Sequence, residues 1–103
     1  MEYRNLGHSG LQVSLVGLGC NNFGGRLDLK ATQAVVHKAL DAGITLFDTA
    51  DVYGNRGGSE EQLGKILGER RKDIVLATKF GMRMDDEGVK KGASRRYIMA
   101  AME

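Results

Sequence analysis

The chain of 103 residues has the size of one domain, with 42% hydrophobic and 27% charged residues. No apolar run approaches the roughly 20 residues of a membrane-spanning helix, and its 15 basic and 13 acidic residues are scattered, so we expect neither a membrane nor a nucleic acid as partner. The single cysteine excludes an internal disulfide and a multi-cysteine metal cluster. Because the first residues show no secretion-signal pattern, we expect a cytoplasmic protein.

The first predicted element is a β-hairpin at residues 3–14. This segment alternates weakly between polar and apolar residues and carries Gly10 where a turn is needed. The apolar run at residues 15–19 follows without polar alternation, which is typical of a parallel strand buried on both faces. Proline is absent and there are 15 glycines, so glycine must form the turns of this chain.

Strands and helices alternate in the middle of the chain. A helix is predicted from about residue 31 to residue 42, and it ends at Gly43, since glycine readily adopts the left-handed conformation that follows a helix. The apolar segment 45–49 is predicted as the second parallel strand. Ser59, followed three residues later by Gln62, matches a capping box and predicts the start of a second helix.

A third apolar strand is predicted at residues 74–79, so that the three strands repeat every 30 residues. Eight such units would give roughly the 250 residues of a typical parallel (β/α)8 TIM barrel. We therefore predict an α/β fold, the N-terminal portion of a (β/α)8 barrel with about three βα units. Half of a doubly wound sheet is the alternative, but the long loops at 50–58 and 81–93 favour the barrel.

The last predicted helix begins after Ser94 and reaches Glu103 without a C-cap, which predicts that residues 1–103 form a single incomplete domain. Three strands of eight leave two open sheet edges, so we expect the chain to associate with itself or with the missing barrel segment. The inward faces expected to lose packing partners contain Val16, Leu18, Leu46, Phe47 and Leu76.

Residues 17–25 form a glycine-rich segment after the first parallel strand. Glycines at such a place let the backbone approach a phosphate group. However, the third glycine of the dinucleotide fingerprint G-x-G-x-x-G would fall on Asn22, and no helix pattern begins directly after it. The segment is therefore more typical of a strand end that faces a ligand or a crowded barrel interior.

Three side chains suited to acid–base chemistry fall at one end of the predicted sheet. Asp48 ends the second strand, Tyr53 follows five residues later, and Lys79 ends the third strand. The 30-residue period places Asp48 and Lys79 one residue apart in register, which predicts an ion pair that holds the ammonium near the tyrosine hydroxyl. A nearby cation lowers the pKa of a phenol from about 10 and makes it a better proton donor. The alternative is that these residues only cap, pair and pack.

The segments LFDTADVYGNRGGSEEQLGKIL and IVLATKFG, preceded by VSLVGLGCNNFGG, resemble the aldo-keto reductase signature over nearly the whole chain. The resemblance implies NAD(P)H-dependent reduction of small aldehydes or ketones. It implies that Tyr53 is the general acid and that Asp48 and Lys79 tune it. Family members complete the site with a histidine after the fourth barrel strand, whereas His8 and His37 are predicted in the hairpin and in an outer helix.

The resemblance also implies the nicotinamide-ribose side of an NADP(H) site, formed by Gly19, Cys20, Asn21, Asp48 and Tyr53. The family's contacts to the adenosine phosphate come from later strands. We therefore expect little or no reductase activity from these residues alone. A non-catalytic cofactor-binding or regulatory subunit with the same fold is the alternative function.

Two other features have simpler interpretations than a functional site. Cys20 by itself is more typical of a small buried thiol than of a redox group. The acidic run at residues 85–87 has no histidine partner, so we predict a solvated loop and no metal site.

Overall fold

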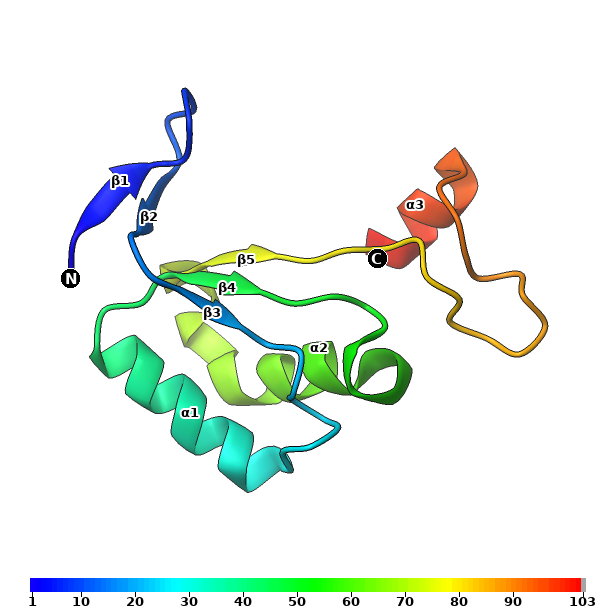
Figure 1. Cartoon of the computed structure of the whole chain (residues 1–103), viewed down its shortest axis with the longest axis horizontal. Helices are drawn as coiled ribbons and strands as arrows, with labels where there is room; N and C mark the ends of the chain where they lie inside the picture. The colour runs from blue at the N-terminus through cyan, green and yellow to red at the C-terminus, as the bar shows by residue number, and fades with distance from the viewer. Residues whose placement is uncertain (103) are drawn as a thin grey trace.

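The computed structural model describes residues 1–102, and its strands form two separate sheets (Figure 1). Strands β1 (Tyr3–Asn5) and β2 (Gln12–Ser14) pair antiparallel as a hairpin. Strands β3 (Gly17–Gly19), β4 (Leu46–Asp48) and β5 (Val75–Ala77) form a parallel sheet in sequential order. The three predicted parallel strands and their order are thus confirmed, although each is shorter than predicted.

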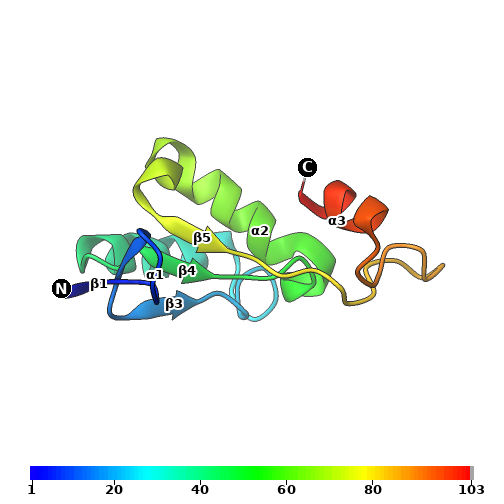
Figure 2. The same ribbon diagram turned by 90° about the horizontal axis from the view of Figure 1, so that it is seen from above.

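Helices α1 (Leu29–Asp41) and α2 (Tyr53–Leu67) follow β3 and β4, and both cover the same face of the parallel sheet (Figures 1 and 2). A 3-10 turn, η1 (Gly68–Asp73), leads into β5. Helix α3 (Arg95–Met102) stands beyond the carboxyl end of β5, and the hairpin lies at the opposite end of the strands. None of these helices is long and apolar enough to cross a lipid bilayer. No described element covers the second face of the sheet, which is the face that a closed barrel would enclose.

The hydrophobic core lies between the sheet and the two helices. Phe47 at its centre is fully buried and belongs to one cluster with Val36 of α1 and Leu63 of α2. Leu18 and Leu76, the register partners of Phe47, also pack against this cluster. The prediction that Leu18, Phe47 and Leu76 face the barrel interior is therefore wrong, because alternation along a strand directs them toward the helices.

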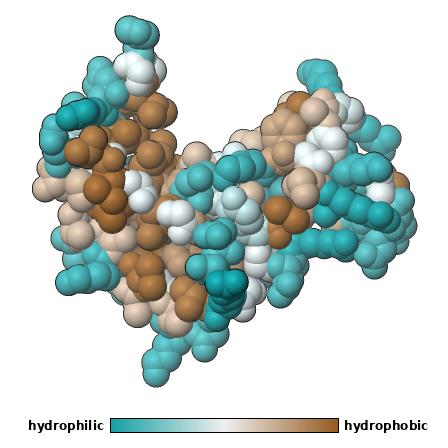
Figure 3. Space-filling model, in the orientation of Figure 1, coloured by the Kyte–Doolittle hydropathy of each residue, from teal (hydrophilic) through white to brown (hydrophobic). Residues whose placement is uncertain are grey.

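Residues 15–19 were predicted to be buried on both faces, and this prediction is also wrong. Leu15 and Val16 are about half exposed and precede β3. Burial on both faces needs a layer on each side, and only the helix layer is present among the described residues. Leu6 and Leu11 of the hairpin are also exposed, and Figure 3 shows hydrophobic residues gathered on the side of the molecule where the hairpin lies.

Side-chain caps define two of the helix starts. The Asp28 carboxylate accepts from the Ala31 backbone N–H at 2.8 Å and begins α1. Ser94 begins α3 as predicted, since its hydroxyl oxygen accepts from the Tyr97 N–H at 3.1 Å. Gly43, with φ of +87°, follows α1 in the left-handed conformation.

The predicted capping box at Ser59 and Gln62 is wrong. Ser59 is fully buried, and its hydroxyl donates to the carbonyl oxygen of Cys20 rather than serving the helix backbone. The Gln62 side chain accepts from the Thr32 hydroxyl of α1 at 2.6 Å. Both residues thus join neighbouring elements. The capping hydrogen bonds are absent, but the predicted helix start is close, because right-handed helical geometry in α2 begins only after the left-handed residues 54–57.

A left-handed turn interrupts α2 directly after its first residue. The φ angle is positive at residues 54–57, including 60° at Asn55 and 64° at Arg56. Gly54 is required in this turn, because a Cβ there would overlap the carbonyl oxygen of Phe23. The four residues of this turn therefore reverse the chain between the carboxyl end of β4 and the right-handed part of α2.

Candidate active site

The register between β4 and β5 determines which side chains share the open face of the sheet. Asp48 pairs with Ala77, so equivalent positions are 29 and not 30 residues apart. Lys79 is two residues beyond Ala77, and alternation therefore directs it to the same face as Asp48. The side chain between them, Thr78, points to the helices and donates to Glu60 of α2 at 2.6 Å. The predicted one-residue offset between Asp48 and Lys79 is thus wrong, and a pairing with that offset would have separated them.

The Lys79 ammonium has three oxygen partners at the carboxyl end of the sheet. Its Nζ lies 2.7 Å from Asp48 Oδ1, 3.0 Å from the Thr49 carbonyl oxygen and 3.4 Å from the Tyr53 hydroxyl oxygen. Three acceptors match the three protons of an ammonium group. The predicted approach of Lys79 to Asp48 and Tyr53 is confirmed. Since Lys79 donates to the Tyr53 oxygen, the phenolic proton of Tyr53 is left to be donated elsewhere.

Solvent limits the strength of the Asp48–Lys79 ion pair. The two side chains are 54% and 49% exposed, and ion pairs at such positions add little to stability. The hydrogen bond that Lys79 donates to Asp48 nevertheless raises the pKa of Lys79 above its ordinary 10.5, with a smaller contribution from Tyr53. The arrangement therefore holds a permanent cation beside a phenol at neutral pH.

Replacing Asp48 by asparagine is expected to lower the pKa of Lys79 toward 10.5, because the carboxylate is the main cause of the increase. In the folded chain the pKa lies above the unfolded value. The stabilisation by this ammonium is therefore complete below the unfolded pKa and is lost as the pH rises through the folded one. NMR titration of the Lys79 13Cε resonance measures the change. Asp86→Asn, which removes an exposed carboxylate paired with Arg56, is the matched control. An unaltered Lys79 pKa in Asp48→Asn would show that Asp48 is not the cause of the raised pKa.

The three predicted cofactor residues after β3 have different surroundings. Gly19 is the register partner of Asp48, and a Cβ on Gly19 would meet no atom within 4 Å. Asn21 is exposed in the turn that follows. Cys20, in contrast, is fully buried in the core, its N–H donates to the Asp48 carbonyl oxygen, and its thiol donates to that of Leu18.

The side chain of Cys20 therefore lies away from the open face, and the contact of this residue with a cofactor stays a prediction. Burial raises the pKa of the Cys20 thiol to about 11, which agrees with its interpretation as an inert core residue. Alternation places its side chain among the helices while the neighbouring Gly19 faces the open side.

The two histidines lie away from the ion pair. His8 belongs to the hairpin turn between β1 and β2, and His37 is exposed on α1. The hairpin is joined to the beginning of β4 by hydrogen bonds between Ser14 and Thr45. Neither histidine therefore takes part in the arrangement around Lys79.

Two carboxylates of the acidic loop before α3 form contacts within the chain. Asp85 accepts from the backbone N–H groups of Val89 and Lys90, and Asp86 pairs with Arg56 at 2.9 Å. Among residues 1–102, no three His, Cys, Asp or Glu side chains are grouped so that they could hold a metal ion.

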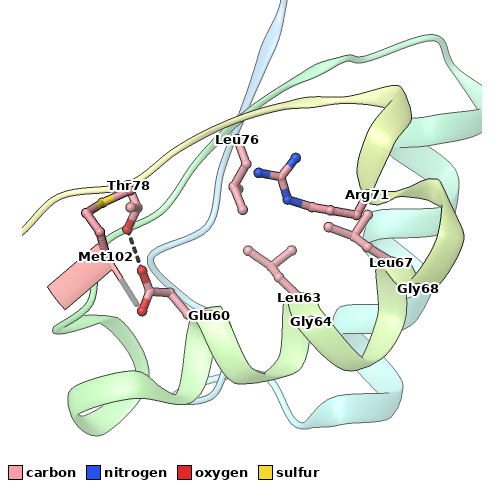
Figure 4. Close-up of a pocket in the computed structure, with 9 residues that line it drawn as sticks. All are labelled: Glu60, Leu63, Gly64, Leu67, Gly68, Arg71, Leu76, Thr78 and Met102. Atoms are coloured by element: carbon pink, nitrogen blue, oxygen red, sulfur yellow. Dashed lines mark hydrogen bonds between the residues drawn. The ribbon is translucent and has the colours of Figure 1, made fainter. Parts of the chain in front are cut away.

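A groove of about 360 Å³ lies on the helix side of β5, away from the ion pair (Figure 4). Leu63 and Leu67 of α2 and Leu76 of β5 form its apolar wall, and Glu60 and Arg71 lie along its rim. It opens where the edge of β5 has no partner strand among the described residues. We interpret it as unfilled packing surface, because Asp48 and Lys79 lie on the other face of the sheet.

Two residues around Lys79 were missed by the sequence analysis. The Thr49 carbonyl is a backbone acceptor, and a backbone group leaves no mark in the sequence. Ser59 was recognised only as a helix cap, although its hydroxyl contacts both Thr49 and Cys20. The role of Ser59 could be recognised only once the packing of α2 against the ends of β3 and β4 was known.

Comparison with known proteins identifies relatives over the whole described fold. The Aldo/keto reductase family model matches residues 15–103. A probable voltage-gated potassium channel subunit beta of Oryza sativa subsp. japonica is 41% identical over 99% of this chain and 32% of its own length. The uncharacterized oxidoreductase YqkF of Bacillus subtilis is 42% identical over 100% of this chain and 33% of its own length.

The fold has the same relatives. The solved structure of aldo-keto reductase AKR11C1 from Bacillus halodurans, in its holo form, superposes with a TM-score of 0.84 and 40% identity over 98% of this chain and 34% of that one. The chain thus spans about a third of the length of its relatives, and its sheet is part of a (β/α)8 barrel rather than half of a doubly wound sheet. Sequence and fold agree over nearly every residue, and the chain belongs to the aldo/keto reductase family.

Proposed function

We propose that the barrel to which these residues contribute reduces an aldehyde or ketone to an alcohol with NADP(H), and that Asp48, Tyr53 and Lys79 supply its acid–base chemistry. The observation that carries this proposal is the position of Lys79 Nζ, 2.7 Å from Asp48 and 3.4 Å from the Tyr53 oxygen. Family membership supports oxidoreduction of carbonyl compounds in general. The preference for NADP(H) over NAD(H) and the cytoplasmic location stay predictions.

Proton transfer follows from the direction of the hydrogen bonds. Tyr53 gives its phenolic proton to the carbonyl oxygen of the substrate, because Lys79 already donates to the Tyr53 oxygen. The ammonium then stabilises the phenolate that is left, and Asp48 keeps the ammonium in place. A reduced nicotinamide, if bound, would supply the hydride for the carbonyl carbon and become oxidised. A C–H bond of the nicotinamide and the O–H bond of Tyr53 would break, one C–H and one O–H bond would form on the former carbonyl group, and the product would be an alcohol.

The open face beside Asp48 has free space above Gly19. Gly17, two residues before Gly19, would direct a Cβ toward the side chain of Leu46, which shows that both glycines face the open side. At Gly19 the same direction leads into free space next to the Asp48 carboxylate. We therefore assign Gly19, Asn21, Asp48 and Tyr53 to the nicotinamide-ribose side of the cofactor site.

The direct test uses a completed barrel, in which residues 1–103 are continued by the later strands of the Bacillus halodurans relative. We expect this completed barrel to oxidise NADPH in the presence of a simple aldehyde, and a polypeptide of residues 1–103 alone to show little or no turnover. A completed barrel that binds NADPH and melts cooperatively, but reduces no simple aldehyde or ketone, would refute the reductase proposal.

Replacing Gly19 by valine in the completed barrel is expected to weaken NADPH binding at least about tenfold, since the new side chain fills the space beside Asp48. The substitution should not disturb the packing within residues 1–102, because no described atom lies within 4 Å of the added Cβ. Fluorescence titration with NADPH measures the affinity. Gly10→Val, an equally open position in the hairpin, is the matched control; equal affinities of the two variants would exclude Gly19 from the cofactor site.

A second function is favoured by the names of relatives. The protein from Oryza sativa is named as a probable potassium channel subunit beta, and a protein from Arabidopsis thaliana that is 42% identical carries the same name. The alternative proposal is therefore a cofactor-binding or regulatory subunit without turnover. NADPH binding by the completed barrel, combined with no reduction of any aldehyde or ketone offered, would support this alternative.

A further inference from the structure

Two buried hydroxyl groups lie directly behind the open face that carries Lys79. Thr49 follows β4, Ser59 lies on α2, and the exposed fraction of each is 0%. Their oxygens are 2.7 Å apart. Because a buried hydroxyl is costly unless it is hydrogen-bonded, this contact holds the helix and the end of the strand in a defined position.

The direction of donation follows from the third partner. Ser59 Oγ lies 2.8 Å from the Cys20 carbonyl oxygen, which can only accept, so the single proton of Ser59 is used there. In the contact between the two hydroxyls, Thr49 must therefore donate. The hydrogen bonds run from Thr49 to Ser59 to Cys20, and this hydroxyl relay joins one side chain of α2 to the residues that follow both β3 and β4.

The relay reaches Lys79 through the backbone of Thr49. The Thr49 side chain enters the helix layer, whereas its carbonyl oxygen accepts from Lys79 Nζ at 3.0 Å. The Thr49 N–H in turn donates to the Ala77 carbonyl oxygen at 2.8 Å. A fixed Thr49 side chain therefore fixes the residue that supplies one of the three acceptors of the ammonium.

We propose that Ser59 is a positioning residue for Lys79. Through the hydroxyl relay it holds the Thr49 carbonyl oxygen where the ammonium donates to it, and this keeps the ammonium beside the Tyr53 hydroxyl. The geometric statement stands on the contacts of this chain, and its consequence for catalysis rests on the proposed function. If Ser59 only completed the core, its loss would lower stability and leave Lys79 unaffected.

The test compares Ser59→Ala and Thr49→Val in the completed barrel with Thr32→Val as the matched control. Thr32 is also fully buried, and its hydroxyl donates to Gln62 of α2. For each variant, NMR measures the rate at which the Lys79 Nζ protons exchange with water, and denaturant unfolding measures stability. We expect Ser59→Ala and Thr49→Val to raise this exchange rate about tenfold. Without the relay the Thr49 carbonyl oxygen moves away from Lys79 Nζ, and the loss of a hydrogen bond to a charged group has an effect of this size. Thr32→Val should lower stability only.

Further variants separate positioning from packing. The double variant Ser59→Ala/Thr49→Val should exchange no faster than either single variant, and Ser59→Cys, which keeps a weak donor, should restore part of the protection. Loss of stability with unaltered Lys79 exchange in Ser59→Ala would overturn the proposal. If Ser59→Ala does not fold, Thr49→Val, which conserves side-chain volume, gives the test. Loss of stability with unaltered Lys79 exchange in this variant would also overturn the proposal.

The readout needs neither cofactor nor substrate. Faster Lys79 exchange in these variants, together with a completed barrel that does not oxidise NADPH, would preserve the positioning inference while the proposed function fails. Unaltered Lys79 exchange in both single variants, together with an active completed barrel, would refute the positioning role of Ser59 and leave the proposed reductase function standing.

Discussion

Replacing Tyr53 by phenylalanine in the completed barrel is expected to lower kcat for aldehyde reduction by about 10²–10⁴-fold, the usual contribution of a positioned general acid. The Kd for NADPH should change little, since the aromatic ring that packs at the start of α2 is retained. The expectation rests on the Lys79 hydrogen bond to the Tyr53 oxygen, which leaves the tyrosine proton as the one available to a substrate.

The measurement is the rate of NADPH oxidation at saturating aldehyde, with NADPH binding determined separately. Tyr3→Phe is the matched control, because the Tyr3 hydroxyl donates to the Gly43 carbonyl oxygen at the opposite end of the strands. This control should keep full activity. Undiminished kcat in Tyr53→Phe would remove Tyr53 from the role of general acid and leave only its packing contribution.

The strands and the end of the sheet that carries the candidate site could be predicted from sequence, because both depend on local features. Apolar runs at a regular spacing define buried parallel strands, and the carboxyl ends of parallel strands meet at one edge. Asp48, Tyr53 and Lys79 each follow such a run by a few residues. Their convergence therefore needed only the direction of the chain, and the structure confirms it.

The register and the buried contacts could not be predicted in the same way. A repeat of 30 residues and a register of 29 differ by one position, which reverses the face of every side chain on β5. Ser59 is separated from Cys20 by 39 residues, so its hydrogen bond depends on how α2 packs against β3. The same serine three residues before Gln62 matches a capping box whether or not the helix uses it. These errors share one cause, because each needed the tertiary contact and not the local pattern.

The open face and edges of the sheet lead to the second prediction with a large effect. Strands β3 and β5 each have one edge without a partner strand in residues 1–102, and no described element covers the face that carries Leu46 and Asp48. Unpaired edges and exposed apolar side chains favour association with further strands. We expect a polypeptide of these 103 residues to sediment as species larger than its 11.2 kDa mass, or to be partly folded.

A pair of valine variants tests whether the sheet is responsible for this association. Val16, next to the open edge of β3, is 51% exposed, and Val89, in the loop before α3, is 76% exposed. Covering such a side chain contributes at most about 1.5–3 kcal/mol, or roughly ten- to hundredfold in an association constant. Val16→Lys should therefore reduce association by up to this factor, because a charge at the sheet edge opposes pairing. Val89→Lys, with the same change in charge, should sediment like the unmodified chain; a compact monomer that melts cooperatively without any substitution would contradict the prediction.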